Sequence, residues 1–403
     1  MTVDARGGFA LCSYWFEDGE SCTNLHVTNN IAGGIAYAGF LTYGHDCGDY
    51  SGDNFKDNVA HSVEGNKGGM GAYIFPDLTK PAHTSTCYEG SRFTAYKCAL
   101  QGAFVFQKMK KVIFSNMLML DNAKGMGTQI EVKGATPKEA EASLDSAEYD
   151  EILMEFHDNT FVGDIGIPDC PNTFNKGDYC IFKDKFAIFP SAVANKGKAP
   201  HITAASALPP QKIKGDSMWG GRTIWRNTVF KNFKPVHQNG QRSTVFGSSH
   251  YQPDYIPMME FYDTTFEDVE HRALAHFIDP LEAWENIDDC GTFSCTAPKN
   301  ILYKFRDTKW KGKRPASSAK DFELIHSNDG FAPYAENCKD YANDWNAYFC
   351  ENDNLGILLF ESLDIGRWDR ALQPVRLNRQ GTEMDNILNA QMDHVWDGFY
   401  TGQ

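Results

Sequence analysis

One short phrase recurs along this chain and constrains its fold more than any other feature. Each copy places an aromatic residue two positions before an asparagine or aspartate and then returns to apolar side chains, as in Trp225, Asn227 and Phe230. Asparagine and aspartate suit a sharp bend because they tolerate left-handed backbone angles, and aromatic and β-branched neighbours favour strands. The copies occupy residues 55–60, 114–118, 156–161, 224–232, 261–266 and 305–310.

A strand–bend–strand unit of this size cannot bury its apolar face alone. It must therefore stack on copies of itself, and stacked strands with bends between them form a solenoid. The pattern predicts an all-β fold: a right-handed parallel β-helix with long loop insertions and a C-terminal capping segment. The alternative is a set of unrelated β-strands that share similar turns.

The predicted β-helix covers residues 1–320, and residues 321–403 are expected to cap its end, because solenoids need terminal caps. Residues 137–149 are rich in alanine and glutamate and predict a short surface helix. Residues 170–217 contain several prolines, which deny ladder hydrogen bonds, so this segment is expected to be loop rather than central strand. Residues 117–120 are continuously apolar and predict a fully buried strand.

The formal net charge of the 403 residues is −15. This charge argues against binding to nucleic acid, which attracts basic patches, and against a polybasic protein of the membrane surface. The sequence has no run of about 18 apolar residues, so no membrane span is expected. Residues 1–6 lack the apolar core of a signal peptide, so we expect either that a signal has been removed or that a longer precursor exists.

Eleven cysteines indicate an oxidising compartment. Ten lie in five pairs of near neighbours, which we expect to form disulfides that pin loops, with Cys47 left over; reduced thiols are the alternative, because sequence alone does not fix connectivity. Metal binding would need Cys-x-x-Cys spacing or matched histidines, and neither is present. The absence of a glycosylation sequon weighs against secretion. The candidate pairs are Cys12 with Cys22, Cys87 with Cys98, Cys170 with Cys180, Cys290 with Cys295, and Cys338 with Cys350.

Several runs, in order along nearly the whole chain, resemble the parallel β-helix region of the fibrocystin family. They are residues 29–34, 58–62, 93–98, 114–118, 358–364, 369–370, 373–376 and 391–396. The resemblance implies a place on large cell-surface proteins with single-pass anchors, including those of cilia or sensory-cell bundles. It also implies a relation to the β-helix of the transmembrane protein 2 and cell-migration-inducing hyaluronidase group.

That relation makes polysaccharide cleavage the rival hypothesis. Such chemistry needs two carboxylates facing across a cleft or a metal-assisted acid–base site. The best candidates are Asp57, His61 and Glu64, with Arg222 as an electrostatic partner. Each also has a plain structural interpretation as a turn, strand or corner residue. The hyaluronidase group often has a second histidine shortly after the Asn-Val-x-His run, where this chain has Asn66.

We therefore expect a non-catalytic structural or adhesive module, extracellular or on the cell surface, that assembles into filaments or a surface coat. Its expected partners are copies of itself or other surface proteins, and glycans are a further candidate. The sequence predicts no cofactor and no metal. A polysaccharide-cleaving, hyaluronidase- or lyase-like, or carbohydrate-binding β-helix protein is the alternative.

Overall fold

The structure is a computed structural model of the chain. It describes residues 2–3, 9–10, 26–35, 37–43, 45–46, 54–63, 69–75, 86–98, 101–105, 111–128, 132–135, 153–165, 201–207, 217–219, 222–235, 237, 242–248, 258–276, 300–312, 319–327, 338–345, 347–351, 355–361, 378–379, 382–383 and 395–401.

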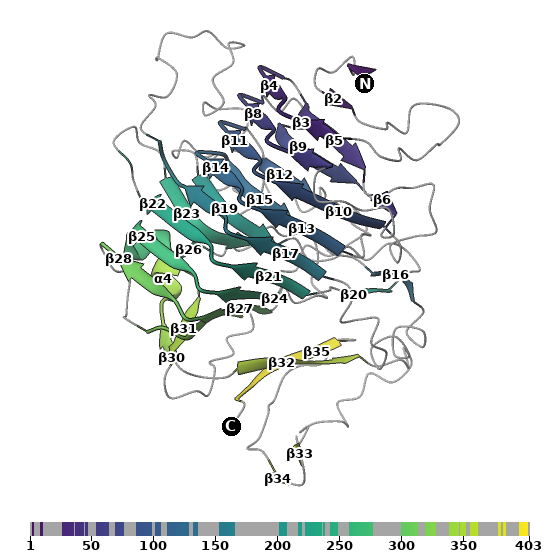
Figure 1. Cartoon of the computed structure of the whole chain (residues 1–403). Coiled ribbons are helices and arrows are strands. Elements are labelled where there is room, and N and C mark those ends of the chain that lie inside the picture. Colours follow the sequence, from purple (N-terminus) through teal and green to yellow (C-terminus); the bar gives the residue numbers. More distant parts are fainter. Residues whose placement is uncertain are drawn as a thin grey trace, which may run out of the picture.

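Most of the described chain is β-strand, arranged in a twelve-stranded, an eight-stranded and a nine-stranded sheet (Figure 1). The chain passes through one strand of each sheet in that order. It then returns to the twelve-stranded sheet beside the strand from which it started, and the strands of successive circuits pair in parallel. We call each circuit a rung; strands β7, β8 and β9 form one, and β10, β11 and β12 form the next.

The twelve-stranded sheet opens each rung. In spatial order its strands are β3 (Val27–Thr28), β7 (Phe55–Lys56), β10 (Thr86–Ser91), β13 (Lys111–Ser115), β17 (Leu153–His157), β21 (Arg222–Arg226), β24 (Met258–Tyr262), β27 (Asn300–Arg306), β29 (Phe322–Ser327), β31 (Tyr348–Glu351) and β30 (Cys338–Asp340), with β6 (His45–Asp46) paired to β10.

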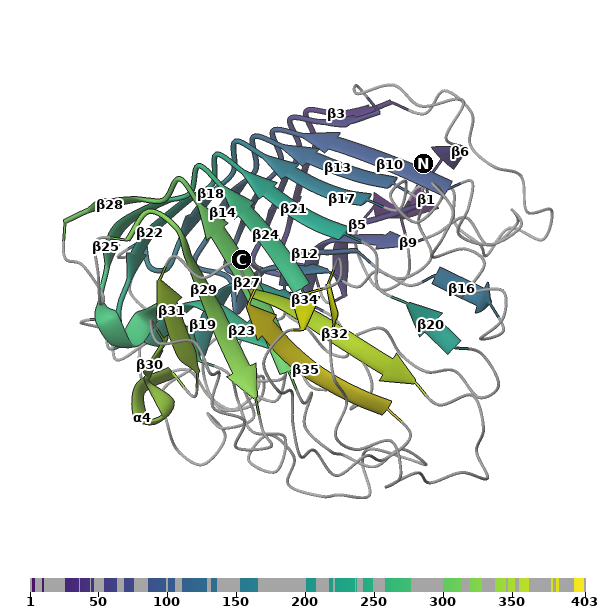
Figure 2. The same ribbon diagram turned by 90° about the horizontal axis from the view of Figure 1, so that it is seen from below.

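The eight-stranded sheet follows after a single bend. It comprises β4 (Ile31–Gly33), β8 (Val59–His61), β11 (Thr94–Tyr96), β14 (Leu118–Leu120), β18 (Thr160–Val162), β22 (Val229–Phe233), β25 (Thr265–Val269) and β28 (Lys309–Lys311). Figure 2 shows these strands meeting the twelve-stranded sheet along a row of bends.

The nine-stranded sheet completes each rung. It comprises β1 (Thr2–Val3), β2 (Phe9–Ala10), β5 (Ala38–Tyr43), β9 (Met70–Phe75), β12 (Gln101–Val105), β15 (Lys124–Thr128), β19 (His201–Ala207), β23 (Arg242–Ser248) and β26 (Ala275–His276). Small antiparallel pairs also form: β16 (Val132–Ala135) with β20 (Ser217–Trp219), β32 (Leu355–Glu361) with β35 (Val395–Thr401), and β33 (Asn378–Arg379) with β34 (Thr382–Glu383). The described helical turns are η2 (His271–Ala273) and α4 (Ala342–Trp345).

The bends predicted from the recurring phrase are confirmed. In all six copies the asparagine or aspartate adopts a left-handed conformation, with φ between 47° and 57°. The same corner is occupied in the rung of β10 by Arg92, whose φ is 50° although that rung lacks the phrase. A local preference for left-handed angles therefore sets most of the corners between the first two sheets.

Aromatic residues two positions before these bends form a column inside the stack. Their rings are fully buried, and successive ring centroids lie 4.1 to 6.4 Å apart with interplanar angles of 10° to 19°. The column contains Phe114, Phe156, Trp225, Phe261 and Phe305, and it continues through Phe322 and Phe349. Offset stacking of this kind adds to the free energy gained by burial.

The column is interrupted at Gly90, where the ring of Phe114 occupies the place of a side chain; a Cβ there would lie 2.5 Å from that ring. Phe93, from the bend of the same rung, turns into the interior instead. Its ring centroid lies 5.3 Å from that of Phe55 and 6.1 Å from that of Phe40. The N-terminal core is thus filled from several columns rather than from one.

Parallel pairing in the twelve-stranded sheet ends at β27. The next strands, β29, β31 and β30, continue the sheet in antiparallel fashion. Trp345 on α4 and Phe349 on β31 are fully buried in the same core. The predicted boundary between residues 320 and 321 falls beside this change in pairing. Among the described residues, no helix is long and apolar enough to cross a membrane.

Two predictions of secondary structure are wrong. The segment predicted as loop at residues 170–217 contains β19, a central strand between β15 and β23, because its prolines flank this strand rather than lie within it. The strand predicted as fully buried at residues 117–120 alternates instead: Met119 is buried, whereas Leu118 points outward and is 36% exposed. The helix predicted at residues 137–149 lies outside the described residues.

Candidate functional site

The outer face of the eight-stranded sheet is the candidate site. The three residues of each strand, or the first three in the longer strands β22 and β25, point alternately away from and into the interior, and the middle one points inward. The inward column starts with alanine and ends with aromatic residues, and all its members are buried except Trp310, which is partly buried. This column contains Ala32, Ala60, Ala95, Met119, Phe161, Phe230, Phe266 and Trp310.

The first outward column is apolar or bears threonine along most of its length. Ile31 is 67% exposed and Leu118 is 36% exposed, and these are the exposed large hydrophobic residues of the described chain. From the N-terminal end, the column reads Ile31, Val59, Thr94, Leu118, Thr160, Val229, Thr265 and Lys309. Lys309 is also exposed, Thr265 is buried and the other members are partly buried. Exposed large apolar side chains such as Ile31 and Leu118 are typical of a surface that packs against another molecule.

The second outward column changes from aromatic through apolar to charged side chains along the stack. Its ring pair, His61 and Tyr96, is stacked with centroids 4.8 Å apart and an interplanar angle of 5°. The His61 ring also lies over Gly33, where a Cβ would come within 2.4 Å of it. Both faces of His61 and the face of Tyr96 that meets it are therefore covered and are not open to a sugar.

Beyond the rings, this column runs through Leu120 and Val162 to charged residues. Lys231 donates to Glu267 at 2.8 Å, and this hydrogen bond lowers the pKa of Glu267 below its ordinary value. Lys311 completes the column. The face is therefore apolar over its N-terminal strands and carries mixed charge at its C-terminal end.

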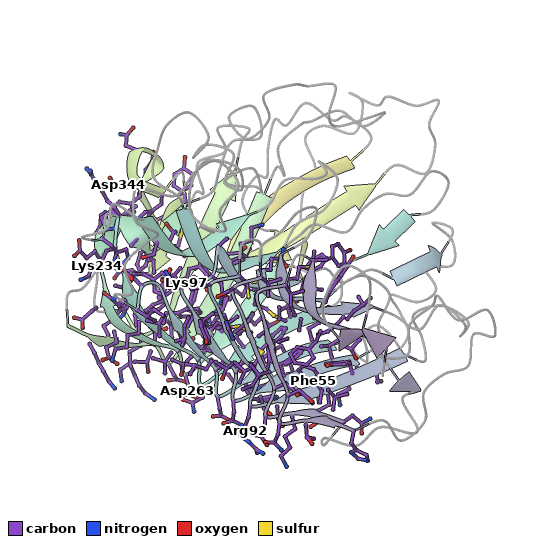
Figure 3. The ribbon with its side chains drawn as sticks, turned by 90° about the horizontal axis from the view of Figure 1, so that it is seen from above. Phe55, Arg92, Lys97, Lys234, Asp263 and Asp344 are labelled. Atoms are coloured by element: carbon purple, nitrogen blue, oxygen red, sulfur yellow. A yellow bond between two sulfur atoms is a disulfide. The ribbon has the colours of Figure 1, made fainter. Side chains whose placement is uncertain are left out.

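The residues predicted for acid–base chemistry do not gather into one site within the described part of the chain. Asp57 accepts two hydrogen bonds of 2.6 Å from Arg92 on the next rung, and these bonds lower the pKa of Asp57. Figure 3 shows Arg92 on the same outer edge as Asp263. His61 lies at the far end of β8, with Nδ1 3.3 Å from Ser62 Oγ.

Arg222 begins β21, which lies four strands from the strand that precedes Asp57. At the usual spacing of parallel strands this separation is about 19 Å. Arg222 is therefore placed too far along the stack to act on the same bond as Asp57. Glu64 lies outside the described residues.

One predicted disulfide is confirmed and another is wrong. Cys338 is bonded to Cys350. Cys87 is also disulfide-bonded, but not to Cys98, because Cys98 follows a bend and points into the core as a buried thiol. Burial raises the pKa of Cys98 to about 12. The other cysteines lie outside the described residues: Cys12, Cys22, Cys47, Cys170, Cys180, Cys290 and Cys295.

Sequence reasoning missed a chain of side chains that joins Asp164, His237 and Ser243. His237 Nδ1 lies 3.2 Å from Asp164 Oδ2, and His237 Nε2 lies 2.5 Å from Ser243 Oγ. The order of groups is that of a serine-hydrolase triad. Ser243, however, is completely buried and Asp164 is 8% exposed. A nucleophile must reach its substrate, so in this conformation the arrangement joins rungs and does not present an attacking hydroxyl.

A second buried basic group lies in the nine-stranded sheet. Lys124 is 5% exposed, and burial lowers its pKa to about 7. Across the described residues, no cluster of three or more histidine, cysteine or acidic side chains is placed to hold a metal ion.

A comparison with protein-family models finds no matching family, and no curated protein matches the sequence.

Proposed function

We propose that this chain is a non-catalytic structural and adhesive module of the extracellular space or cell surface. In this proposal the three-sheet stack is a right-handed parallel β-helix, and copies of it associate sideways through the outer face of the eight-stranded sheet. The observation that carries the proposal is the first outward column of that face, in which the large apolar side chains of Ile31 and Leu118 are exposed.

The distribution of charge on this face permits a second copy as the occupant of its apolar N-terminal part. At a net charge of −15, two copies repel one another in most orientations. In the two outward columns Glu267 is the one carboxylate, against three lysines, Lys231, Lys309 and Lys311. These charges lie on β22, β25 and β28, so two copies that meet through the apolar N-terminal strands bring no carboxylate of the two columns together.

The size of the face sets the strength of the contact. Eight strands of three residues cover roughly 400 Å², which is about half of what each partner buries in a standard stable interface. A single pair of copies is therefore expected to associate weakly. In a filament or surface coat many such contacts act together, and avidity then supplies the stability.

The disulfide between Cys338 and Cys350 supports the proposed location, because disulfides persist in oxidising compartments. It pins the antiparallel strands β30 and β31 at the C-terminal end of the stack. The exposed face and the pinned end together suit a rigid module that works outside the reducing interior of the cell.

Sedimentation velocity over a wide concentration range tests the proposal. The wild-type chain is expected to show concentration-dependent association. The double variant Ile31→Lys, Leu118→Lys should lose this association, because it places charge in the apolar column. Thr28→Lys is the matched control, since Thr28 is exposed on β3 of the same rung as Ile31 but belongs to the twelve-stranded sheet.

A strictly monomeric wild-type chain, or a double variant that associates as the wild type does, would contradict the proposal. The catalytic alternative has its own readout: incubation with hyaluronan and measurement of chain length. Shortening of hyaluronan by the wild type that is lost in His61→Ala would replace the adhesive function with a catalytic one.

A further inference from the structure

Residues 338–345 and 347–350 cross the C-terminal end of the stack, and we call them the cap loop. The cap loop begins on β30 and ends within β31, the last two strands of the twelve-stranded sheet in the described part of the chain. Between these strands it passes through α4, which lies against β26 of the nine-stranded sheet (Figure 1). The cap loop therefore bridges two of the three sheets across the end of the interior.

Trp345 is the residue of the cap loop that enters the interior. Its side chain is fully buried in the main core, and its ring centroid lies 6.0 Å from that of Phe349. Its indole N–H donates to the carbonyl oxygen of His271, in η2, at 2.6 Å. A buried tryptophan whose N–H has a partner both fills the end of the core and fixes the cap loop to the turn before β26.

Further side chains hold α4 against η2. Asp344 Oδ2 lies 3.1 Å from His271 Nε2, and Asp344 Oδ1 lies 2.9 Å from Arg272 Nε. The rings of His271, Tyr341 and Trp345 pack together, with centroids 4.3 to 5.0 Å apart. On the side of the cap loop, these contacts all come from α4 and the residue before it.

A single helical turn is not stable by itself, so the docked position of α4 depends on how the ends of the cap loop are held. Cys338 and Cys350 are directly opposite one another in the antiparallel register of β30 and β31, and their disulfide closes the loop that contains α4. The bonded residues are 12 apart in sequence. Closing a loop of this size removes many of the open conformations that compete with the docked one.

We propose that the cap loop is a redox-sensitive closure of the core: the disulfide keeps Trp345 docked, and a dithiol that reduces the bond makes the cap loop open more often. A thiolate of the dithiol attacks the sulfur of Cys338, because Cys338 is partly exposed whereas Cys350 is fully buried, and Cys350 leaves as a thiolate. The second thiol of the dithiol then displaces Cys338. The dithiol is oxidised to a disulfide, and its two electrons and two protons leave both cysteines as thiols.

The coupling between the bond and the docked position is reciprocal. If the disulfide favours docking by a given factor, docking must favour the disulfide over the two thiols by the same factor. The cap loop therefore gives two independent readouts of one quantity, the rate at which it opens and the ease with which its bond is reduced.

Hydrogen exchange measures the effect of the bond on the cap loop. The test compares the wild type with the double variant Cys338→Ser, Cys350→Ser in dilute solution. The amides of Tyr341 and Trp345 donate to backbone carbonyl oxygens within the cap loop, and they should exchange roughly 10- to 100-fold faster in the variant. The amides of β18 and β22 should keep their rates. Unchanged rates in the cap loop, or an equal increase in every rung, would overturn the proposal.

Reduction of the bond measures the same coupling from the other side. Folded protein is equilibrated with mixtures of reduced and oxidised dithiol, and alkylation of Cys338 and Cys350 is followed by mass spectrometry. Trp345→Ala should lower the ratio of reduced to oxidised dithiol at half-reduction by roughly the factor found in the exchange experiment. Lys339→Ala is the matched control, because Lys339 is exposed on β30 and pairs with Glu351 rather than with η2, and it should leave the ratio unchanged. An unchanged ratio in Trp345→Ala would overturn the proposal.

Asp344→Ala keeps the proposal testable if the other variants do not fold. The Asp344 side chain is 26% exposed, so its removal disturbs the core less than removal of Trp345. It should lower the half-reduction ratio in the same direction by a smaller factor, and no change would overturn the proposal. These measurements are made in dilute solution, so their outcome does not depend on the proposed association between copies.

Discussion

Different side chains fill the interior of the stack at its two ends. In the N-terminal rungs the eight-stranded sheet contributes Ala32, Ala60 and Ala95 to the interior, and the space is filled by Phe55 and Phe93 from other columns. In the C-terminal rungs nearly every inward position of this sheet is aromatic, and a second ring column stacks beside it. The cross-section of a rung must be filled to the density of a protein interior, but the column that fills it can vary.

The ends differ in their polar interior as well. Asn58 follows the first bend and is fully buried; it accepts from the Asn30 backbone N–H at 3.1 Å and donates to the Val27 carbonyl at 2.7 Å. Thr264 occupies the equivalent position near the other end, also fully buried, and its hydroxyl makes no hydrogen bond within the described chain. At this position the rung of Asn58 is joined to its neighbour by a side-chain amide, whereas the rung of Thr264 depends on packing.

Removing a ring from the C-terminal column should have the largest effect. Phe261 lies between Trp225 and Phe305, with centroids 6.0 and 4.6 Å away. We expect Phe261→Ala to lower the free energy of unfolding by about 3–5 kcal/mol, because it leaves a cavity between two stacked rings in the fully buried core. Phe261→Leu is the control and should recover most of this loss. A loss below about 1 kcal/mol in urea unfolding would show that the column is not the main support.

The two polar positions should respond with opposite sign. Asn58→Ala should lower the free energy of unfolding by about 2 kcal/mol, because it strips partners from buried backbone groups. Thr264→Val keeps the shape of the side chain and removes a buried hydroxyl without a hydrogen bond, so a gain of about 1 kcal/mol is expected. If calorimetry finds that both substitutions destabilise equally, the contrast between amide-joined and packed rungs fails.

Substitutions at the bends should change the free energy of unfolding least. The effect should be similar at both ends of the stack. Asn116 is exposed at a bend with φ of 56°. We expect Asn116→Ala to cost about 1 kcal/mol, because a Cβ disfavours the left-handed conformation, and Asn116→Gly to cost only a few tenths. Thermal unfolding of the two variants checks this order. The reverse order would mean that the asparagine side chain, rather than the backbone angle, holds the corner.

The sequence predicted well those features that depend on the conformational preference of single residues. The corners at Asp57, Asp158 and Asn227 were predictable because each residue favours the required angle by itself. The bend at Arg92 was not predictable, because arginine does not favour this angle by itself. Arg92 instead forms an ion pair with Asp57 on a neighbouring rung. Strand β19 was missed because its small residues carry little hydrophobic signal between prolines.

The candidate site was predictable only in part. The position of His61 on a strand of the stack could be predicted, but the exposure of Leu118 could not, because inward and outward positions depend on where the bends fall. The short separation of Cys87 and Cys98 suggested a disulfide, whereas the bend before Cys98 turns it into the core. The contacts of His237 with Asp164 and Ser243 form only because successive rungs stack, so no local sequence pattern predicts them.

Hydroxyl-radical footprinting at low and high protein concentration tests the proposed association most directly. Oxidation of Leu118 and Tyr96 on the eight-stranded sheet should fall as concentration rises, whereas oxidation of Tyr262 on the twelve-stranded sheet should stay constant. Protection of Tyr262 with no change at Leu118 and Tyr96, or no protection anywhere, would contradict the claim that copies meet through this face.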